Sequence, residues 1–298
     1  MRVVVTRPAG QAGKWVNGLR AAGLNALSMP LIEIGAVPDV QGLAQAWMAL
    51  SGYDAVMFVS ANAVDGFFDA RPGEAGGWPQ IGAVRPRVWV TGPASVAALL
   101  RQGVPVDAID APSESDGQYD SEALWQRVQR QVHPGFRCLI VRGTIEATAT
   151  DVSALGSAAA DTDAMDHSDA DTLAAFAPAE PLPDAPPGHG RDWLADTLRA
   201  SGARVDFVVA YVRRLPSLSF NAVALIQVAS SDGTVWLFTS SEAIENLRTL
   251  VPAQRWGQAR AVVTHARIAQ AAREAGFGVV CESRPSLDAL VASIESLQ

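Results

Sequence analysis

The amino-acid sequence repeats itself, and this repeat constrains the fold more than any other feature. Three segments of the first half recur in the second half in the same order. The pairs are RVVVTR at 2–7 with RCLIVR at 137–142, DAVMFVSANAVDGF at 54–67 with TVWLFTSSEAIENL at 234–247, and VTGPASVAALLRQG at 90–103 with VTHARIAQAAREAG at 263–276. An internal repeat indicates structural units of the same type. We therefore predict two similar domains with a cleft between them.

Each repeated segment combines a strand pattern with a helix pattern. Residues 2–6 form an apolar run followed by a Pro-Ala-Gly turn and a helix expected around 15–22, and residues 54–59 form a second run followed by a helix from Ser60 onward. Continuous apolar runs are typical of strands that are buried on both faces of a parallel sheet. Strands alternating with helices indicate an α/β fold. The sequence thus predicts two similar, doubly wound, parallel-sheet α/β domains.

Two extended segments interrupt this alternation. Residues 29–34 and 207–213 match each other at an offset of 179, and each follows the first repeated segment of its half. If both segments cross between the domains, they form a two-stranded linker, and the first repeated segment belongs with the last two. This arrangement predicts one discontinuous domain, 1–35 plus 215–298, and a second domain at 38–208.

The segment 144–189 differs in composition from the rest of the chain. It contains nine acidic residues, no lysine or arginine, and five prolines near its end. The remaining chain has 22 acidic and 23 basic residues, so the net charge of −8 comes from this segment. One sign of charge, low hydrophobicity and clustered prolines indicate disorder. We predict a disordered acidic insertion, which is either a tolerated surface insertion or an interaction segment.

Several functional classes lack their sequence signatures. The sequence has no G-x-x-x-x-G-K-[ST] loop, no G-x-G-x-x-G after a strand and no H-E-x-x-H, and Lys14 is its only lysine. Cys138 and Cys281 lie in apolar runs and are expected to be buried free thiols rather than metal ligands. The apolar runs have the length of strands and the first residues lack a signal-peptide pattern, so we expect a cytoplasmic protein without a membrane span.

Candidate binding residues lie where strands are expected to end, because ligands bind at the carboxyl ends of strands in open α/β sheets. They are two arginines at equivalent strand ends and small residues at helix starts: Arg7, Arg142, Ser60, Ala61, Asn62, Gly92, Ser95, Ser240 and Ser241. Arginines and helix N-termini favour anions. Each serine is alternatively a helix cap, each arginine a surface ion pair, and Tyr211 a packing residue of the linker.

In this order the segments resemble the uroporphyrinogen-III synthase family. The resemblance rests on VTRPAGQ at 5–11, PLIEI at 30–34, D-x-V-x-F-x-S-A-N-A-V at 54–64, GPAS at 92–95, VRG at 141–143, YVRR at 211–214, FTSSEAIENL at 238–247 and PSLDAL at 285–290. It implies an enzyme of heme biosynthesis that cyclises linear hydroxymethylbilane to uroporphyrinogen III, inverting ring D and releasing water. It also implies that no metal or organic cofactor takes part.

The resemblance further implies the discontinuous domain, the two-stranded linker and Tyr211 as the candidate general acid. The substrate would be a linear tetrapyrrole with eight carboxylates, bound by a monomer that needs neither nucleic acid nor a membrane. The insertion separates Arg142-Gly143 from Gly190-Arg191, which lie nearly adjacent in the family, and we expect no catalytic role for His265. The main alternative is a two-domain small-molecule binding protein without catalysis, and a nucleotide-dependent enzyme is opposed by the missing glycine motifs.

Overall fold

The chain divides into two compact units, which we describe separately. The computed structural model describes residues 1–38, 40–73, 78, 86–113, 119–146 and 191–297. Unit 1 consists of Met1–Gly35 and Arg213–Gln298, and unit 2 consists of Ala36–Val212. The predicted domains, 1–35 plus 215–298 and 38–208, stay a prediction. The predicted insertion lies outside the described residues, apart from its first three positions.

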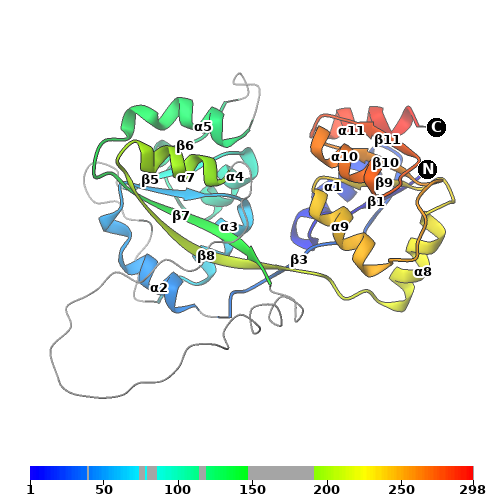
Figure 1. Cartoon of the computed structure of the whole chain (residues 1–298), viewed down its shortest axis with the longest axis horizontal. Helices are drawn as coiled ribbons and strands as arrows, with labels where there is room; N and C mark the ends of the chain where they lie inside the picture. Colours follow the sequence, from blue (N-terminus) through cyan, green and yellow to red (C-terminus); the bar gives the residue numbers. More distant parts are fainter. Residues whose placement is uncertain (39, 74–77, 79–85, 114–118, 147–190, 298) are drawn as a thin grey trace, which may run out of the picture. The chain divides into compact units, whose positions relative to one another are not determined.

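Unit 1 contains a five-stranded parallel sheet with the strand order β11-β10-β9-β1-β2. The strands are β1 (Arg2–Val5), β2 (Asn25–Ser28), β9 (Val235–Phe238), β10 (Arg260–Val263) and β11 (Val279–Glu282). The helices are α1 (Ala9–Ala21), α8 (Phe220–Ala229), α9 (Ser241–Leu250), α10 (Ala266–Glu274) and α11 (Leu287–Glu295). They cover both faces of the sheet (Figure 1), since Val3 packs in a core with α1 and α11 while Val4 packs in another with α9 and α10.

Unit 2 is built around a six-stranded sheet with the strand order β3-β8-β7-β4-β5-β6. The strands are β3 (Glu33–Gly35), β4 (Ala55–Phe58), β5 (Arg87–Val90), β6 (Ile109–Asp110), β7 (Arg137–Ile145) and β8 (Arg204–Arg214). The helices are α2 (Gln41–Met48), α3 (Ala61–Asp69), α4 (Pro93–Arg101), α5 (Ser121–Val128) and α7 (Arg191–Ala200), with 3-10 turns at Leu50–Gly52, Val106–Ala108 and Gln129–Gln131. The chain leaves unit 1 after β3 and returns to it within β8, and these two strands are neighbours in the sheet.

The internal repeat is preserved in the register of the strands. Ala55 of β4 pairs with Cys138 of β7, and at the repeat-related positions Val235 of β9 pairs with Val3 of β1. The first repeated segment of each half therefore lies in the sheet formed by the last two segments of the other half. In each sheet the chain adds strands first on one side of this pair and later on the other side. This change of strand order places a topological switch point between β1 and β9 and another between β4 and β7.

Four local expectations were wrong. Helix α1 begins at Ala9, so the expected Pro-Ala-Gly turn is its first turn, with Pro8 as the residue that precedes it; proline suits a helix start because its φ is already fixed. Of the expected extended segment 29–34, only Glu33 and Ile34 lie in a strand. Strand β7 continues to Ile145, beyond the expected start of the insertion. Cys138 is buried as expected, but Cys281 is partly exposed on the edge strand β11.

Candidate functional site

Two hydroxyl groups meet at the carboxyl end of the sheet in unit 2. Ser60 follows β4 and precedes α3, and its Oγ accepts a hydrogen bond from the N–H of Ala63 at 3.2 Å. The Ser60 hydroxyl in turn donates to the phenol oxygen of Tyr211 on β8, also at 3.2 Å. The helix-cap interpretation of Ser60 is therefore confirmed, and its role in binding substrate stays a prediction. Each of the two hydroxyl groups can donate to the other, and the phenol of Tyr211 carries a proton that it can transfer.

Arg142 lies within β7 and packs against an aromatic ring of the neighbouring strand β8. Its guanidinium carbon lies 4.5 Å from the centre of the Phe207 ring, which Arg199 also covers at 5.4 Å. Because β7 continues to Ile145, Arg142 does not end its strand as expected.

Arg7 lies two residues after the end of β1 in unit 1 and contacts two side chains of α1. Its Nη2 donates to Oε1 of Gln11 at 2.9 Å, and its guanidinium carbon lies 5.2 Å from the centre of the Trp15 ring. Burial lowers the pKa of Arg7, and its Nε is buried without a hydrogen-bond partner among the described residues. A partly buried cation with one unsatisfied buried donor is costly, and an incoming carboxylate would offset this cost.

Ser240 and Ser241 stand at the start of α9, beside the end of β9. Ser240 precedes the helix, but its side chain makes no capping hydrogen bond, in contrast to Ser60. Glu242 in the first turn of α9 binds Arg213 at 2.8 Å, and both of these side chains are about one-fifth exposed. A carboxylate that is held at a helix N-terminus beside an arginine demonstrates that this place accepts negative charge.

The remaining candidates lie at or near the starts of α3 and α4. Ala61 and Asn62 form the first turn of α3 and are partly exposed. Gly92 precedes α4, whereas Ser95 is only 5 % exposed within that helix. His265 caps α10 by accepting the N–H of Arg267 on Nδ1 at 3.1 Å.

Four residues that contact the candidates or lie beside them were not predicted as site residues from the sequence: Gln11, Trp15, Arg213 and Gly143. The first two were missed because α1 was expected to begin later, and its proline was the available signal. Gly143 carries a signal of its own, since a glycine within an apolar strand often marks a close approach of another group. The ion pair of Arg213 depends on the fold and leaves no pattern in the sequence.

A perturbed tyrosine lies at the opposite edge of the sheet in unit 2. The Tyr53 hydroxyl donates to Asp206 at 3.0 Å, and Arg137 lies over its ring at 4.7 Å and donates to the same carboxylate at 3.4 Å. Burial, followed by the negative charge of Asp206, raises the pKa of Tyr53 to about 12. Because Tyr53 and Arg137 stand at the amino ends of β4 and β7, we interpret this cluster as structural.

This interpretation predicts the alkaline behaviour of the protein. Spectrophotometric titration after a rapid pH jump should show one tyrosine that ionises near pH 12, and Tyr53→Phe should remove this transition. The folded state keeps this proton above pH 10, where the unfolded state loses it, so the contribution to stability declines between about pH 10 and 12. A Tyr53→Phe difference spectrum centred near pH 10 would contradict the assignment.

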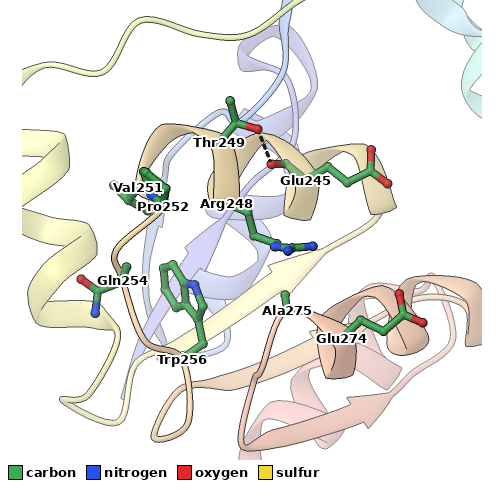
Figure 2. Close-up of a pocket in the computed structure, with 9 residues that line it drawn as sticks. All are labelled: Glu245, Arg248, Thr249, Val251, Pro252, Gln254, Trp256, Glu274 and Ala275. Carbon is green, nitrogen blue, oxygen red and sulfur yellow. Dashed lines mark hydrogen bonds between the residues drawn. The ribbon is translucent and has the colours of Figure 1, made fainter.

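A hollow on unit 1 lies away from these residues. Figure 2 shows it between α9, the loop that follows and the end of α10, with a volume of about 510 Å³. Its lining includes Arg248, Trp256 and Glu274. These residues belong to the ends of helices that return to the amino edge of the sheet, opposite the edge where ligands bind in such folds. We therefore do not include the hollow in the candidate site.

Two other findings concern the whole described chain. Among the described residues, no helix has both the length and the apolar character needed to cross a membrane. Over the same residues, no group of three or more His, Cys, Asp and Glu side chains is arranged to hold a metal ion.

Comparison with known proteins identifies the family. The family model described as uroporphyrinogen-III synthase HemD matches residues 13–166 and 170–292. The uroporphyrinogen-III synthase of Synechococcus elongatus is 30 % identical over 249 residues, which cover 84 % of this chain and 74 % of that protein. The enzyme of Salmonella typhimurium is 27 % identical over 281 residues, covering 93 % and 92 %.

Among solved structures, a mutant uroporphyrinogen III synthase from the extremely thermophilic bacterium Thermus thermophilus matches all of this chain and 98 % of its own, with 16 % identity and a TM-score of 0.48. The family match spans both repeated halves and includes the segments that carry the Ser60–Tyr211 pair and the start of α9. The resemblance noted in the sequence is therefore confirmed, and this chain belongs to the uroporphyrinogen-III synthase family.

Proposed function

We propose that this protein cyclises hydroxymethylbilane to uroporphyrinogen III, with inversion of ring D and loss of water, in heme biosynthesis. The observation that supports this most directly, beside the family, is the Ser60–Tyr211 hydroxyl pair at the carboxyl end of the sheet in unit 2. A reaction that begins with the departure of a hydroxyl group needs a proton donor, and Tyr211 can supply one.

In this proposal Tyr211 acts at the first step. The pyrrole nitrogen pushes electrons toward the hydroxymethyl carbon, the C–O bond breaks, and the phenol proton passes to the leaving oxygen, which departs as water. Ring D attacks the resulting azafulvene through its substituted carbon to give a spiro intermediate, which fragments and recloses. The proton lost from ring D as its aromaticity returns balances the proton that Tyr211 supplied. Holding the chain in the spiro-forming shape is the protein's second task.

Groups at the carboxyl ends of the strands in each unit suit the carboxylates of the substrate. Arg7 is a partly buried cation without a carboxylate partner among the described residues, and the starts of α3 and α9 present backbone N–H groups. We assign the contacts with carboxylates to these groups and to Ser240 and Ser241. We also propose that Arg142 contacts a carboxylate of the substrate. Arg142 stands at the repeat position of Arg7 and lies against the Phe207 ring.

Isomer analysis tests the function. Purified protein incubated with hydroxymethylbilane should yield mainly the type III isomer, separated from type I by chromatography, whereas spontaneous closure gives the symmetric type I product. Protein inactivated by heat is the control. A product that is type I at the spontaneous rate would favour the alternative, a binding protein without catalysis. Since one chain contains both repeat units, we expect a monomer to be active, which sedimentation under assay conditions can verify.

A further inference from the structure

The ring of Tyr211 lies directly against the backbone of Gly143 on the neighbouring strand β7. A Cβ placed on Gly143 would lie 2.3 Å from Cζ, 2.5 Å from Cε2 and 2.7 Å from Cε1 of Tyr211. Real Cβ atoms essentially never come within 3.0 Å of another heavy atom. The closest atom, Cζ, is the one that bears the hydroxyl group. The absence of a side chain at position 143 therefore determines where the phenol oxygen lies.

The backbone conformation does not explain this glycine. The glycines with positive φ among the described residues are Gly23, Gly103, Gly135, Gly202, Gly233 and Gly276, and Gly143 is not among them. Its strand conformation is open to any residue. Space for the Tyr211 ring is thus the reason that the structure offers for glycine at this position.

One further contact holds the backbone beside Tyr211, and another holds its hydroxyl group. A Cβ on Gly66 of α3 would lie 2.2 Å from the carbonyl oxygen of Ala210, so α3 packs on the backbone of β8 next to Tyr211. The same helix carries Ser60 at its N-terminus, and the Ser60 hydroxyl binds the phenol oxygen. Tyr211 is only 5 % exposed, so its ring has little freedom to move.

The internal repeat shows which part of this arrangement is particular to unit 2. Ser240 stands at the repeat position of Ser60, whereas Ile32 stands at that of Tyr211. The strand that corresponds to β7 in unit 1 ends at Val5, so it provides no counterpart of Gly143. The serine is therefore common to both units, and the contact between a phenol ring and a strand glycine belongs to unit 2.

We propose that Gly143 is a positioning residue for the reaction: it lets the Tyr211 ring lie on β7, so that the phenol proton is held at the start of α3, beside the departing hydroxyl group. The inference rests on the proposed role of Tyr211 as the acid. An alanine methyl group would displace the ring by about 1 Å, and a misplacement of that size can lower a rate about 10²-fold.

A double-mutant cycle tests the proposal. Gly143→Ala should lower kcat about 10²-fold with little change in KM, and should lower kcat less than about twofold further when Tyr211 is already Phe, because the two changes remove one function. Gly42→Ala on α2 is the matched control, since nothing lies within 4 Å of the added methyl group, and it should keep wild-type kinetics. Equal losses in both backgrounds would overturn the proposal in favour of a general structural role for Gly143.

A second measurement separates the position of the ring from its chemistry. The chain has three tyrosines, so ¹³Cζ-labelled tyrosine gives three NMR signals. Gly143→Ala should shift the Tyr211 signal and leave those of Tyr53 and Tyr119 in place. Ser60→Ala, which adds no volume, should shift the same signal and serves if Gly143→Ala does not fold. An unchanged Tyr211 signal in Gly143→Ala would overturn the proposal that Gly143 positions the ring. If the signal shifts but Tyr211→Phe has a wild-type kcat, Gly143 positions the ring and Tyr211 is not the acid.

Discussion

Tyr211→Phe should lower kcat by about 10²–10⁴-fold, which is the usual range for the loss of a general acid. The substitution keeps the ring that packs against Gly143 and removes only the hydroxyl group and its bond with Ser60. Ser60 keeps its hydrogen bond with the N–H of Ala63, so α3 stays capped. The measurement is kcat with hydroxymethylbilane, together with the proportion of type III product.

Tyr119→Phe is the matched control for this variant. Tyr119 is 44 % exposed, and the same chemical change there should leave kcat as it is in the wild type. Thermal unfolding of both variants checks that the fold is unaffected. If Tyr211→Phe has a wild-type kcat, the phenol has no part in proton transfer, and shape selection by the site becomes the main source of catalysis.

Arg7→Ala should raise KM about 10–100-fold and change kcat little. A hydrogen bond to a charged group contributes about 1.5–3 kcal/mol, and about 1.4 kcal/mol corresponds to a factor of ten. The Arg7–carboxylate contact that we propose exists before and during the reaction, so it contributes uniform binding and its loss appears in KM. Steady-state kinetics with varied hydroxymethylbilane concentration measures both constants.

Arg2→Ala provides the control on the same strand. Arg2 lies at the amino end of β1, where it pairs with Asp232 at 2.9 Å, while Arg7 follows the carboxyl end. The two variants lose the same side chain at opposite edges of one sheet, and only Arg7→Ala should affect KM. Equal kinetics in Arg7→Ala and the wild type would make Arg7 a structural residue held by Gln11 and Trp15.

The sequence predicted the fold better than the details of the site. The repeat identified β1, β4, β5, β7, β9 and β10 because these strands carry continuous apolar runs. It did not reveal β2, β6 and β11, which are short strands near or at the sheet edges, with polar residues such as Asn25 and Asp110. Edge strands are only partly buried, so selection for apolar side chains is weaker there.

The site was only partly predictable for a different reason. Ser60 was recognisable because a small polar residue between a strand and a helix has a defined local role. The contacts of Arg7 with Trp15 and of Tyr211 with Gly143 depend on where α1 begins and on how β7 and β8 lie together. Such contacts follow from tertiary packing, and no spacing in the sequence encodes them.

The first repeated segment of each half lies in the sheet of the other half, and this arrangement has a consequence for synthesis on the ribosome. Strand β1 pairs with β2 and β9, and β9 belongs to the segment that follows the whole of unit 2. At about 5–20 residues per second, the translation of Ala36–Val212 separates the emergence of Met1–Gly35 from that of its remaining partners by roughly 10–35 s. During this interval unit 2 can fold as one continuous segment, while the edge of β1 that later pairs with β9 stays unpaired. An unpaired strand edge is a template for pairing with another chain, and β1 presents such an edge until β9 has been synthesised.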